Sequence, residues 1–257
     1  MNGTVTKIEA QDSKDNTTLF SVTTQSGGEG AEEVVSARKV VLATGLRDIL
    51  PGTPGVEENW GKGIYWCPWC DGHEHADQSL GLLGPLEEAA GLTREILTLN
   101  TDLVALVNGT DTPEARAAAE ESFPGWEEFL ALNNVTLENR TIASITRLQD
   151  GGDNGADPSL PTAPEKDLFR VDFEGENSEP LQRAAFFASF PDEQKSSVGE
   201  DLGVELLGGR LSADPTKGLV TNINGVYAIG DANSDNVTNV PHALFSGKRT
   251  AVYLHGE

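Results

Sequence analysis

Basic residues, cysteine and long apolar runs are all scarce in this 257-residue chain, and each shortage excludes a class of protein. There are 18 lysines and arginines against 41 aspartates and glutamates, which gives a formal net charge of −23. This charge repels nucleic acid and anionic membranes, so we expect neither as a partner. No run approaches the ~18 consecutive apolar residues of a membrane span. Residues 1–5 lack the basic and then apolar order of a secretory signal, so we expect a cytoplasmic protein.

The chain has only two cysteines, Cys67 and Cys70, in the sequence CPWCDG. In an intracellular α/β protein this spacing is more often catalytic or metal-binding than a structural crosslink. Redox use requires a thiol of lowered pKa and a second thiol close enough to resolve a mixed disulfide. Pro68 is expected to stiffen the turn and Trp69 to shield it. Asp71 places a carboxylate within reach of a thiolate, as a candidate proton carrier.

A zinc site made of both cysteines with His73 and His75 is the alternative use of this motif. The histidines follow the second cysteine after two residues, and one residue separates them. Zinc sites usually leave a longer loop, and three to five residues between the histidines. Haem attachment requires histidine at the position that Asp71 occupies. The spacing therefore predicts no metal site.

The apolar pattern predicts a mixed α/β fold in which two buried strands end in small residues. Residues 39–45 form an apolar run that ends in Ala-Thr-Gly, and residues 225–231 form a second that ends in Gly-Asp. Because parallel strands place ligands at their carboxyl ends, these two ends are candidates to meet in space. Further strands are expected at 4–9, 19–24 and 32–37 as an antiparallel meander, and at 80–85, 102–107, 134–137, 142–146, 168–173, 183–188 and 219–221, with helices at 86–98, 113–123, 126–132 and 240–254, a turn at 27–30 and a surface loop at 150–166.

Several motifs follow in the order found in a known enzyme family. They are ATG at 43–45, GIYWCPWCDG at 63–72 and VYAIGD at 226–231, followed by NVPHAL at 239–244 and SGK at 246–248. In this order the chain resembles thioredoxin reductase-like FAD-dependent pyridine nucleotide-disulfide oxidoreductases, and the last two runs are most similar to the fungal type. The resemblance implies a two-domain flavoprotein disulfide reductase-like α/β fold. Residues 1–60 and 188–257 would form the FAD-binding domain, and residues 61–187 an inserted NAD(P)-binding-like domain that carries the CxxC motif.

The resemblance also implies roles for individual residues. Cys67 and Cys70 match the redox disulfide, with Cys70 nearer the flavin, and Asp71 matches the catalytic acid. Gly230 and Asp231 match the motif that hydrogen-bonds the ribityl and phosphate region of FAD. The residues assigned to FAD binding are Thr44, Gly45, Gly230, Asp231, Asn239, Val240 and His242.

The last three of these residues stand at the start of the closing helix. Asn239 and Val240 fall where the family begins this helix beside the isoalloxazine ring. His242 is a candidate to approach the flavin, and helix capping or packing is the alternative for a single histidine there.

The chain departs from the family at the start of the FAD-binding domain. Relatives begin with a strand and a G-x-G-x-x-G turn that binds the FAD pyrophosphate, and no such motif precedes Ala43. We therefore expect Met1 to fall inside this domain, so that a βαβ unit of about 30 residues or more is missing. The expected FAD-binding domain is incomplete.

A second departure concerns NADPH. The turn that should bind its pyrophosphate reads GLLGPLEE at 81–88, in which Pro85 lacks an N–H and Glu87 and Glu88 bring negative charge to the phosphate position. After the next strand no arginine occurs before Arg116 to bind a 2′-phosphate. We expect an NAD(P)-like domain without a working NADPH site.

Together these features favour a flavin-linked dithiol/disulfide oxidoreductase. Cys67 would exchange with a thioredoxin-like protein or a small dithiol or disulfide substrate, Cys70 would contact FAD and Asp71 would move the proton. Electrons would come from another protein or pass to oxygen, and the resemblance implies a homodimer. Two alternatives stay open: an ordinary NADPH-dependent thioredoxin-disulfide reductase, and a non-catalytic truncated remnant that lacks FAD.

Overall fold

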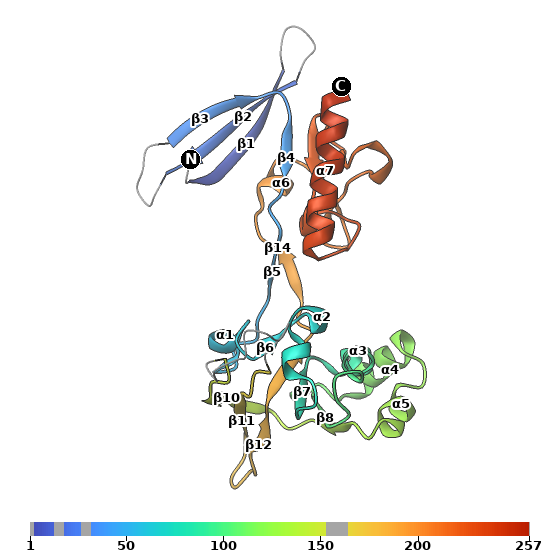
Figure 1. The fold of residues 1–257 in the computed structure, drawn as a ribbon. Coiled ribbons are helices and arrows are strands. Elements are labelled where there is room, and N and C mark those ends of the chain that lie inside the picture. Colours follow the sequence, from blue (N-terminus) through green and yellow to red (C-terminus); the bar gives the residue numbers. More distant parts are fainter. Residues whose placement is uncertain (1–2, 13–17, 27–31, 153–163, 257) are drawn as a thin grey trace. The chain divides into compact units, whose positions relative to one another are not determined.

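The computed structural model describes residues 3–12, 18–26, 32–152 and 164–256 (Figure 1). The turn predicted at 27–30 and most of the loop predicted at 150–166 lie outside these residues. The chain divides into two compact units, residues 1–48 with 192–257, and residues 49–191. None of the helices among the described residues combines the length and apolar character needed to cross a bilayer.

The boundaries of these units differ from the predicted domain limits at 60 and 188. Residues 49–60 belong to the second unit, because Val56 packs in its core with Ile64 and Ile145. At the other junction the second unit continues to Pro191.

The first unit opens with the predicted meander, which is confirmed. Strands β1 (Thr4–Asp12), β2 (Thr18–Gln25) and β3 (Glu32–Ala37) pair in that order, and both pairings are antiparallel. The apolar side of the meander is anchored by Phe20, which is fully buried in a cluster with Val40 and Leu42.

The two strands that end in small residues do meet. Strands β4 (Val40–Leu42) and β17 (Val226–Ala228) form a parallel pair in which Leu42 lies opposite Ala228. Their carboxyl ends therefore lie side by side. The other strands of this unit pair antiparallel, as β5 (Leu46–Asp48) with β14 (Asp192–Gln194) and β15 (Leu206–Leu207) with β16 (Arg210–Leu211).

Two expectations in the first unit change. Residues 219–221 form no strand: Val220 makes only isolated bridges, to Asp214 and Tyr227. The closing helix α7 (Val240–Gly256) is present, but its apolar side chains are not all buried, since Leu244 is 71% and Val252 66% exposed. The unit also contains the short helix α6 (Val198–Asp201) and the 3₁₀ turns η3 (Pro215–Lys217) and η4 (Gly230–Ala232).

The second unit is built on a five-stranded parallel sheet. Its order is β6–β13–β7–β8–β9, and every neighbouring pair is parallel. The strands are β6 (Ile64–Tyr65), β13 (Ala185–Ala188), β7 (Leu80–Leu83), β8 (Leu103–Leu106) and β9 (Thr136–Glu138). Strand β7, helix α3 (Ala89–Ile96) and strand β8 make one βαβ unit, from the strands predicted at 80–85 and 102–107 and the helix predicted at 86–98. Its helix starts later than expected, after a 3₁₀ turn at η2 (Leu86–Glu88).

One core of this unit packs α3, α4 (Pro113–Ser122) and α5 (Trp126–Leu132) against the sheet. A second core includes residues of the small antiparallel sheet β10 (Ile142–Gln149), β11 (Leu168–Phe173) and β12 (Leu181–Arg183). There Phe169 meets Phe186 edge-on, with ring centroids 5.5 Å apart. The unit also contains the one-turn helices α1 (Val56–Asn59) and α2 (Pro68–Asp71) and the 3₁₀ turn η1 (His73–His75).

Candidate active site

The cysteine motif forms a closed disulfide turn just after β6. Cys67 and Cys70 are bonded, with their Cα atoms 5.2 Å apart. The amides of Cys70 and Asp71 donate to the Cys67 carbonyl at 3.1 and 3.2 Å, which winds the segment into α2. Glycine is required at position 72, because a Cβ there would lie 2.2 Å from the Pro68 carbonyl oxygen. Local backbone bonds therefore hold the two sulfurs at ring-closing distance.

The disulfide is accessible from its second cysteine. Cys70 is exposed and Cys67 is half-buried. Trp69, expected to shield the turn, is itself 79% exposed. Exposure favours exchange with an external thiol, because reaction requires access to a sulfur.

Asp71 occupies a setting that favours its neutral form. Burial raises the pKa of its carboxyl above the ordinary value, the negative charge of Glu74 raises the pKa further, and His75 opposes both. A carboxyl whose pKa is moved toward neutrality can both give and take a proton beside a thiol. Asp71 therefore suits the part of proton carrier, which stays a prediction.

The raised pKa of Asp71 has a consequence for stability. The neutral carboxyl favours the folded chain, so its contribution is full below 3.8, the ordinary pKa, and is lost as the pH rises through the folded value. Asp71→Asn should therefore raise the unfolding temperature of the oxidised chain at pH 7, with a gain that shrinks toward pH 3. Thermal unfolding followed by circular dichroism tests this, with Glu176→Gln at an exposed position in the same unit as the control. An equal gain at both pH values would contradict it.

In the first unit, the ends of β4 and β17 frame a cavity of about 260 Å³. The residues that line it are Ala43, Gly45, Ile229, Gly230, Asp231 and Ala243. Gly45 and Gly230 both have a left-handed backbone, with φ of 68° and 63°. A Cβ added at Gly45 would meet no atom within 4 Å, so this side of the cavity leaves the backbone open to a ligand.

Polar groups at this cavity fit part of a dinucleotide such as FAD. Thr44 has a buried hydroxyl oxygen without a partner, and Asp231 offers a half-buried carboxylate for a ribityl hydroxyl. The amide of Gly230, in contrast, is already engaged, because it donates to the Ser246 hydroxyl at 3.0 Å. Gly45, Gly230 and Asp231 line one cavity, and Thr44 precedes Gly45 in the chain. The role of these four residues in FAD binding remains a prediction.

The three candidates on α7 make contacts of their own. The Asn239 side chain accepts a hydrogen bond from the His242 amide at 2.8 Å, which makes Asn239 the cap of the helix. The His242 ring lies against Asp235, with Nε2 3.1 Å from a carboxylate oxygen. Val240 is 72% exposed. The contact with Asp235 favours the packing alternative for His242, and Asn239 caps the helix, while Val240 is available for contact. The roles of these three residues toward the flavin stay predictions.

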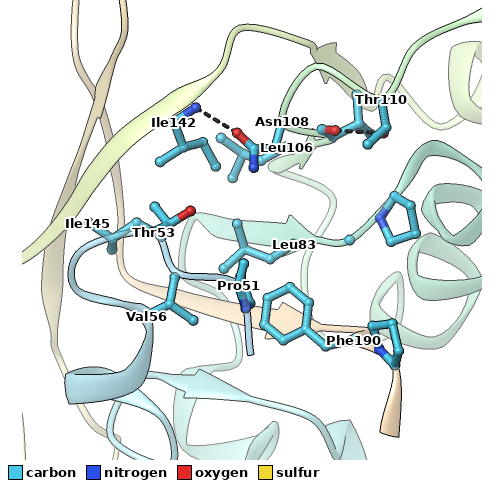
Figure 2. Close-up of a pocket in the computed structure, with 14 residues that line it drawn as sticks. Pro51, Thr53, Val56, Leu83, Leu106, Asn108, Thr110, Ile142, Ile145 and Phe190 are labelled. Atoms are coloured by element: carbon cyan, nitrogen blue, oxygen red, sulfur yellow. Dashed lines mark hydrogen bonds between the residues drawn. The ribbon is translucent and has the colours of Figure 1, made fainter. Parts of the chain in front are cut away.

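The second unit has an apolar cavity at the carboxyl ends of β7 and β8, where a nucleotide would be expected (Figure 2). It measures about 230 Å³, and none of the described residues that line it carries a charge. Figure 2 shows side chains such as Leu83, Leu106 and Phe190 facing this space. Its lining is Pro51, Thr53, Val56, Leu83, Gly84, Pro85, Leu106, Val107, Asn108, Thr110, Ile142, Ile145, Phe190 and Pro191.

Polar groups at the rim of this apolar cavity already have partners within the chain. The Asn108 side-chain oxygen accepts from the Ile142 amide at 2.7 Å (Figure 2). The Thr110 hydroxyl donates to the Val107 carbonyl at 2.6 Å and accepts from the Leu86 amide at 3.0 Å. The first amide after Pro85 is therefore not free to bind a phosphate.

The first arginine after β8 is also engaged. Arg116 bonds both carboxylate oxygens of Asp111 and also pairs with Glu127. These bonds lower the pKa of Asp111 and raise that of Arg116. Glu88 accepts from the Ser189 hydroxyl at 3.3 Å, so an acidic side chain stays at the turn after β7.

The residues that line this apolar cavity could not be identified from the sequence. Pro51, Ile142 and Phe190 are far apart in the chain, and they come together only because β10 and the two ends of the unit pack over β7 and β8. The sequence offers one indication at this place, the turn at Pro85, and that turn argues only against NADPH binding.

Comparison with known proteins gives a consistent relationship, although no protein-family model matches the chain. The chain is 44% identical over 249 residues to a protein of Arthroderma benhamiae named "Probable thioredoxin reductase", a match that covers 93% of this chain and 57% of that protein. It is 31% identical over 258 residues to a thioredoxin reductase of Treponema pallidum, over 96% of this chain and 69% of the relative. The chain thus spans less than two thirds of the fungal relative.

Solved structures share the fold. The thioredoxin reductase of Streptococcus pyogenes superposes with a TM-score of 0.70 at 18% identity, over 99% of this chain and 74% of that one. The Treponema pallidum relative is more than 30% identical, and the match covers more than two thirds of its length. The chain therefore belongs to the thioredoxin reductase family of FAD-dependent oxidoreductases, and its fold is that of a flavoprotein disulfide reductase.

Proposed function

We propose that this chain is a flavin-linked dithiol/disulfide oxidoreductase that uses the Cys67–Cys70 pair and has no working NADPH site. The observation that carries the proposal is the closed Cys67–Cys70 disulfide in a turn that leaves neither cysteine fully buried. Membership of the thioredoxin reductase family supports the redox role of this pair. The substrate would be a thioredoxin-like protein or a small dithiol or disulfide, and the active form a homodimer.

The proposed exchange balances as a two-electron reaction. The Cys67 thiolate attacks one sulfur of a substrate disulfide and expels the other sulfur as a thiolate. Cys70 then attacks Cys67 in the mixed disulfide, so the Cys67–Cys70 bond forms and the second substrate thiolate leaves. Asp71 accepts the proton that Cys70 releases, and protons complete the two substrate thiols. Oxidation of a dithiol substrate is the same sequence reversed.

The cysteine pair returns to its other state by gaining or losing two electrons. FAD, when bound, would supply or accept them. Thr44, Gly45, Gly230 and Asp231 would hold its ribityl and phosphate region at the cavity between β4 and β17. Val240 would lie near the ring system.

The proposed loss of the NADPH site rests on the cavity of Figure 2. A dinucleotide phosphate requires free amides or cations, and here the lining is uncharged, the Leu86 amide is engaged and Arg116 is paired. Electrons would then come from another protein or pass to oxygen.

This proposal predicts that NADPH does not stabilise the chain. A ligand at 100 times its Kd adds about 2.7 kcal/mol of stability. NADPH at about 1 mM, the upper end of ordinary KM values, should leave the unfolding temperature unchanged. The same titration with FAD should raise it. A saturable rise with NADPH would favour an ordinary NADPH-dependent thioredoxin reductase instead.

Flavin content separates an enzyme from a non-catalytic remnant. The purified chain, incubated with FAD and desalted, should retain the yellow flavin absorption, and denaturation should release FAD. A folded chain that retains no flavin would favour the remnant.

A further inference from the structure

A second group of chemically capable side chains gathers in the unit that carries the disulfide. His75 ends the turn η1, and Glu165 and Asp167 lie just before β11. One ligand atom from each of the three lies within 4.8 Å of the other two. Nε2 of His75 is 4.0 Å from a carboxylate oxygen of Glu165, which is too long for a hydrogen bond.

Two of these side chains are buried with polar atoms that have no partner. His75 is fully buried, and neither of its ring nitrogens has a hydrogen-bond partner. The side chain of Asp167 is fully buried, and its Oδ2 also has none. A buried polar group without a partner is unfavourable, so a ligand that satisfies several of them is favoured.

Hydrogen bonds hold Glu165 and Asp167 in place without using the Oδ2 atom of Asp167. The Glu165 amide donates to the Glu74 carbonyl at 2.9 Å, and the Gln78 side chain donates to the carbonyls of both residues. Oδ1 of Asp167 accepts from Arg147 and from the Gly151 amide, at 2.6 Å in each case. The segment before β11 is thereby fixed against η1, while Oδ2 stays open.

We propose that His75, Glu165 and Asp167 bind one Zn²⁺ ion. One imidazole nitrogen and two carboxylates form a donor set that zinc accepts, with a water molecule as fourth ligand. Magnesium and calcium prefer oxygen ligands alone. Zinc bonds of about 2.0–2.2 Å require the ligand atoms to lie closer together than at present, where they are within 4.8 Å of one another. Glu165 is the half-exposed member of the three and has the most room to move toward the others.

The electrostatics at this place favour a cation. The ring of Tyr65 stacks on His75 with centroids 5.2 Å apart. Arg147 compensates one of the two carboxylates, which leaves net negative charge for a divalent ion.

This site differs from the zinc alternative weighed from the sequence, because it uses neither cysteine. The two can be separated by keeping the disulfide closed. The oxidised chain, verified to have no reactive thiol, is stripped with chelator, equilibrated with ZnSO₄ in the presence of excess Mg²⁺, desalted and analysed for bound metal. Competition against a chromophoric chelator then gives the zinc Kd.

The proposal predicts one zinc per oxidised chain. Glu165→Gln and His75→Gln should each weaken binding at least about 10-fold, in the range seen when metal-site residues are altered. His73→Gln is the matched control, because His73 belongs to the same turn and is exposed outside the cluster. Zinc should also raise the unfolding temperature of the unaltered chain and not that of Glu165→Gln.

Three results would overturn the proposal. They are no stoichiometric zinc in the oxidised chain, undiminished zinc in Glu165→Gln, and zinc bound only after the disulfide is reduced. Glu165→Gln keeps the test decisive if His75→Gln fails to fold, because the Glu165 side chain is 34% exposed.

Discussion

Replacing Cys70 with serine should stop the exchange reaction at its midpoint. The reduced Cys70→Ser chain keeps the Cys67 thiol, which attacks a chromogenic disulfide such as DTNB and remains attached to half of it, because no second thiol resolves the bond. Catalytic turnover of a disulfide or dithiol should fall by about 10³-fold or more. Mass spectrometry would show the adduct, and absorption would show release of one half of the reagent instead of two.

The matched variant, Cys67→Ser, distinguishes the two cysteines. If Cys67 is the exchanging cysteine, its loss should slow the first attack itself. The exposure seen here does not favour this assignment, because Cys70 is exposed and Cys67 is half-buried. Faster adduct formation by Cys67→Ser than by Cys70→Ser would reverse the roles, and undiminished turnover by Cys70→Ser would remove the pair from the mechanism.

Gly55→Ala should be among the most destabilising single changes in the unit that carries the disulfide. Gly55 has φ of 92°, and a Cβ there would lie 1.7 Å from the backbone oxygen of Ile145. Either the chain before α1 or strand β10 must move, which breaks the 2.9 Å bond from the Ile145 amide to Pro54. We expect a loss of about 3 kcal/mol or more in the free energy of unfolding, measured by urea titration.

Gly61→Ala is the control for this prediction. Gly61 has a comparable φ of 71°, but a Cβ there would meet no atom within 4 Å. Only the left-handed backbone penalty remains, about 1–2 kcal/mol. Equal losses in the two variants would show that close approach of β10 to Gly55 is not what requires glycine.

The parallel strands could be predicted because burial on both faces leaves a direct mark on the sequence. Leu80–Leu83 and Leu103–Leu106 are buried throughout, so their apolar runs are uninterrupted. The small residues that end β4 and β17 likewise predicted that the carboxyl ends of these strands lie together as a candidate ligand site, and the two strands do pair. Residues 219–221 were wrongly predicted as a strand. Leu219 and Thr221 are buried there, but Val220 makes only isolated bridges and no strand forms.

Other features depend on contacts that no local pattern records. The apolar cavity combines Pro51, Ile142 and Phe190, and the proposed zinc site combines His75 with Glu165 and Asp167. Each set is assembled from separate segments. The zinc alternative predicted from the sequence used only residues close to the cysteines, because a sequence shows the spacing within one motif and not the contacts between distant segments.

The central claim is that Cys67–Cys70 is a working redox pair and not a structural crosslink, and its reduction potential tests this most directly. The chain is equilibrated in dithiol/disulfide buffers of stepped potential, alkylated and weighed by mass spectrometry. We expect one two-electron transition, in which the ratio of reduced to oxidised chain changes tenfold for about 30 mV of potential. Its midpoint potential should lie above about −300 mV. A disulfide that stays closed well below about −300 mV, as structural disulfides do, would contradict the account.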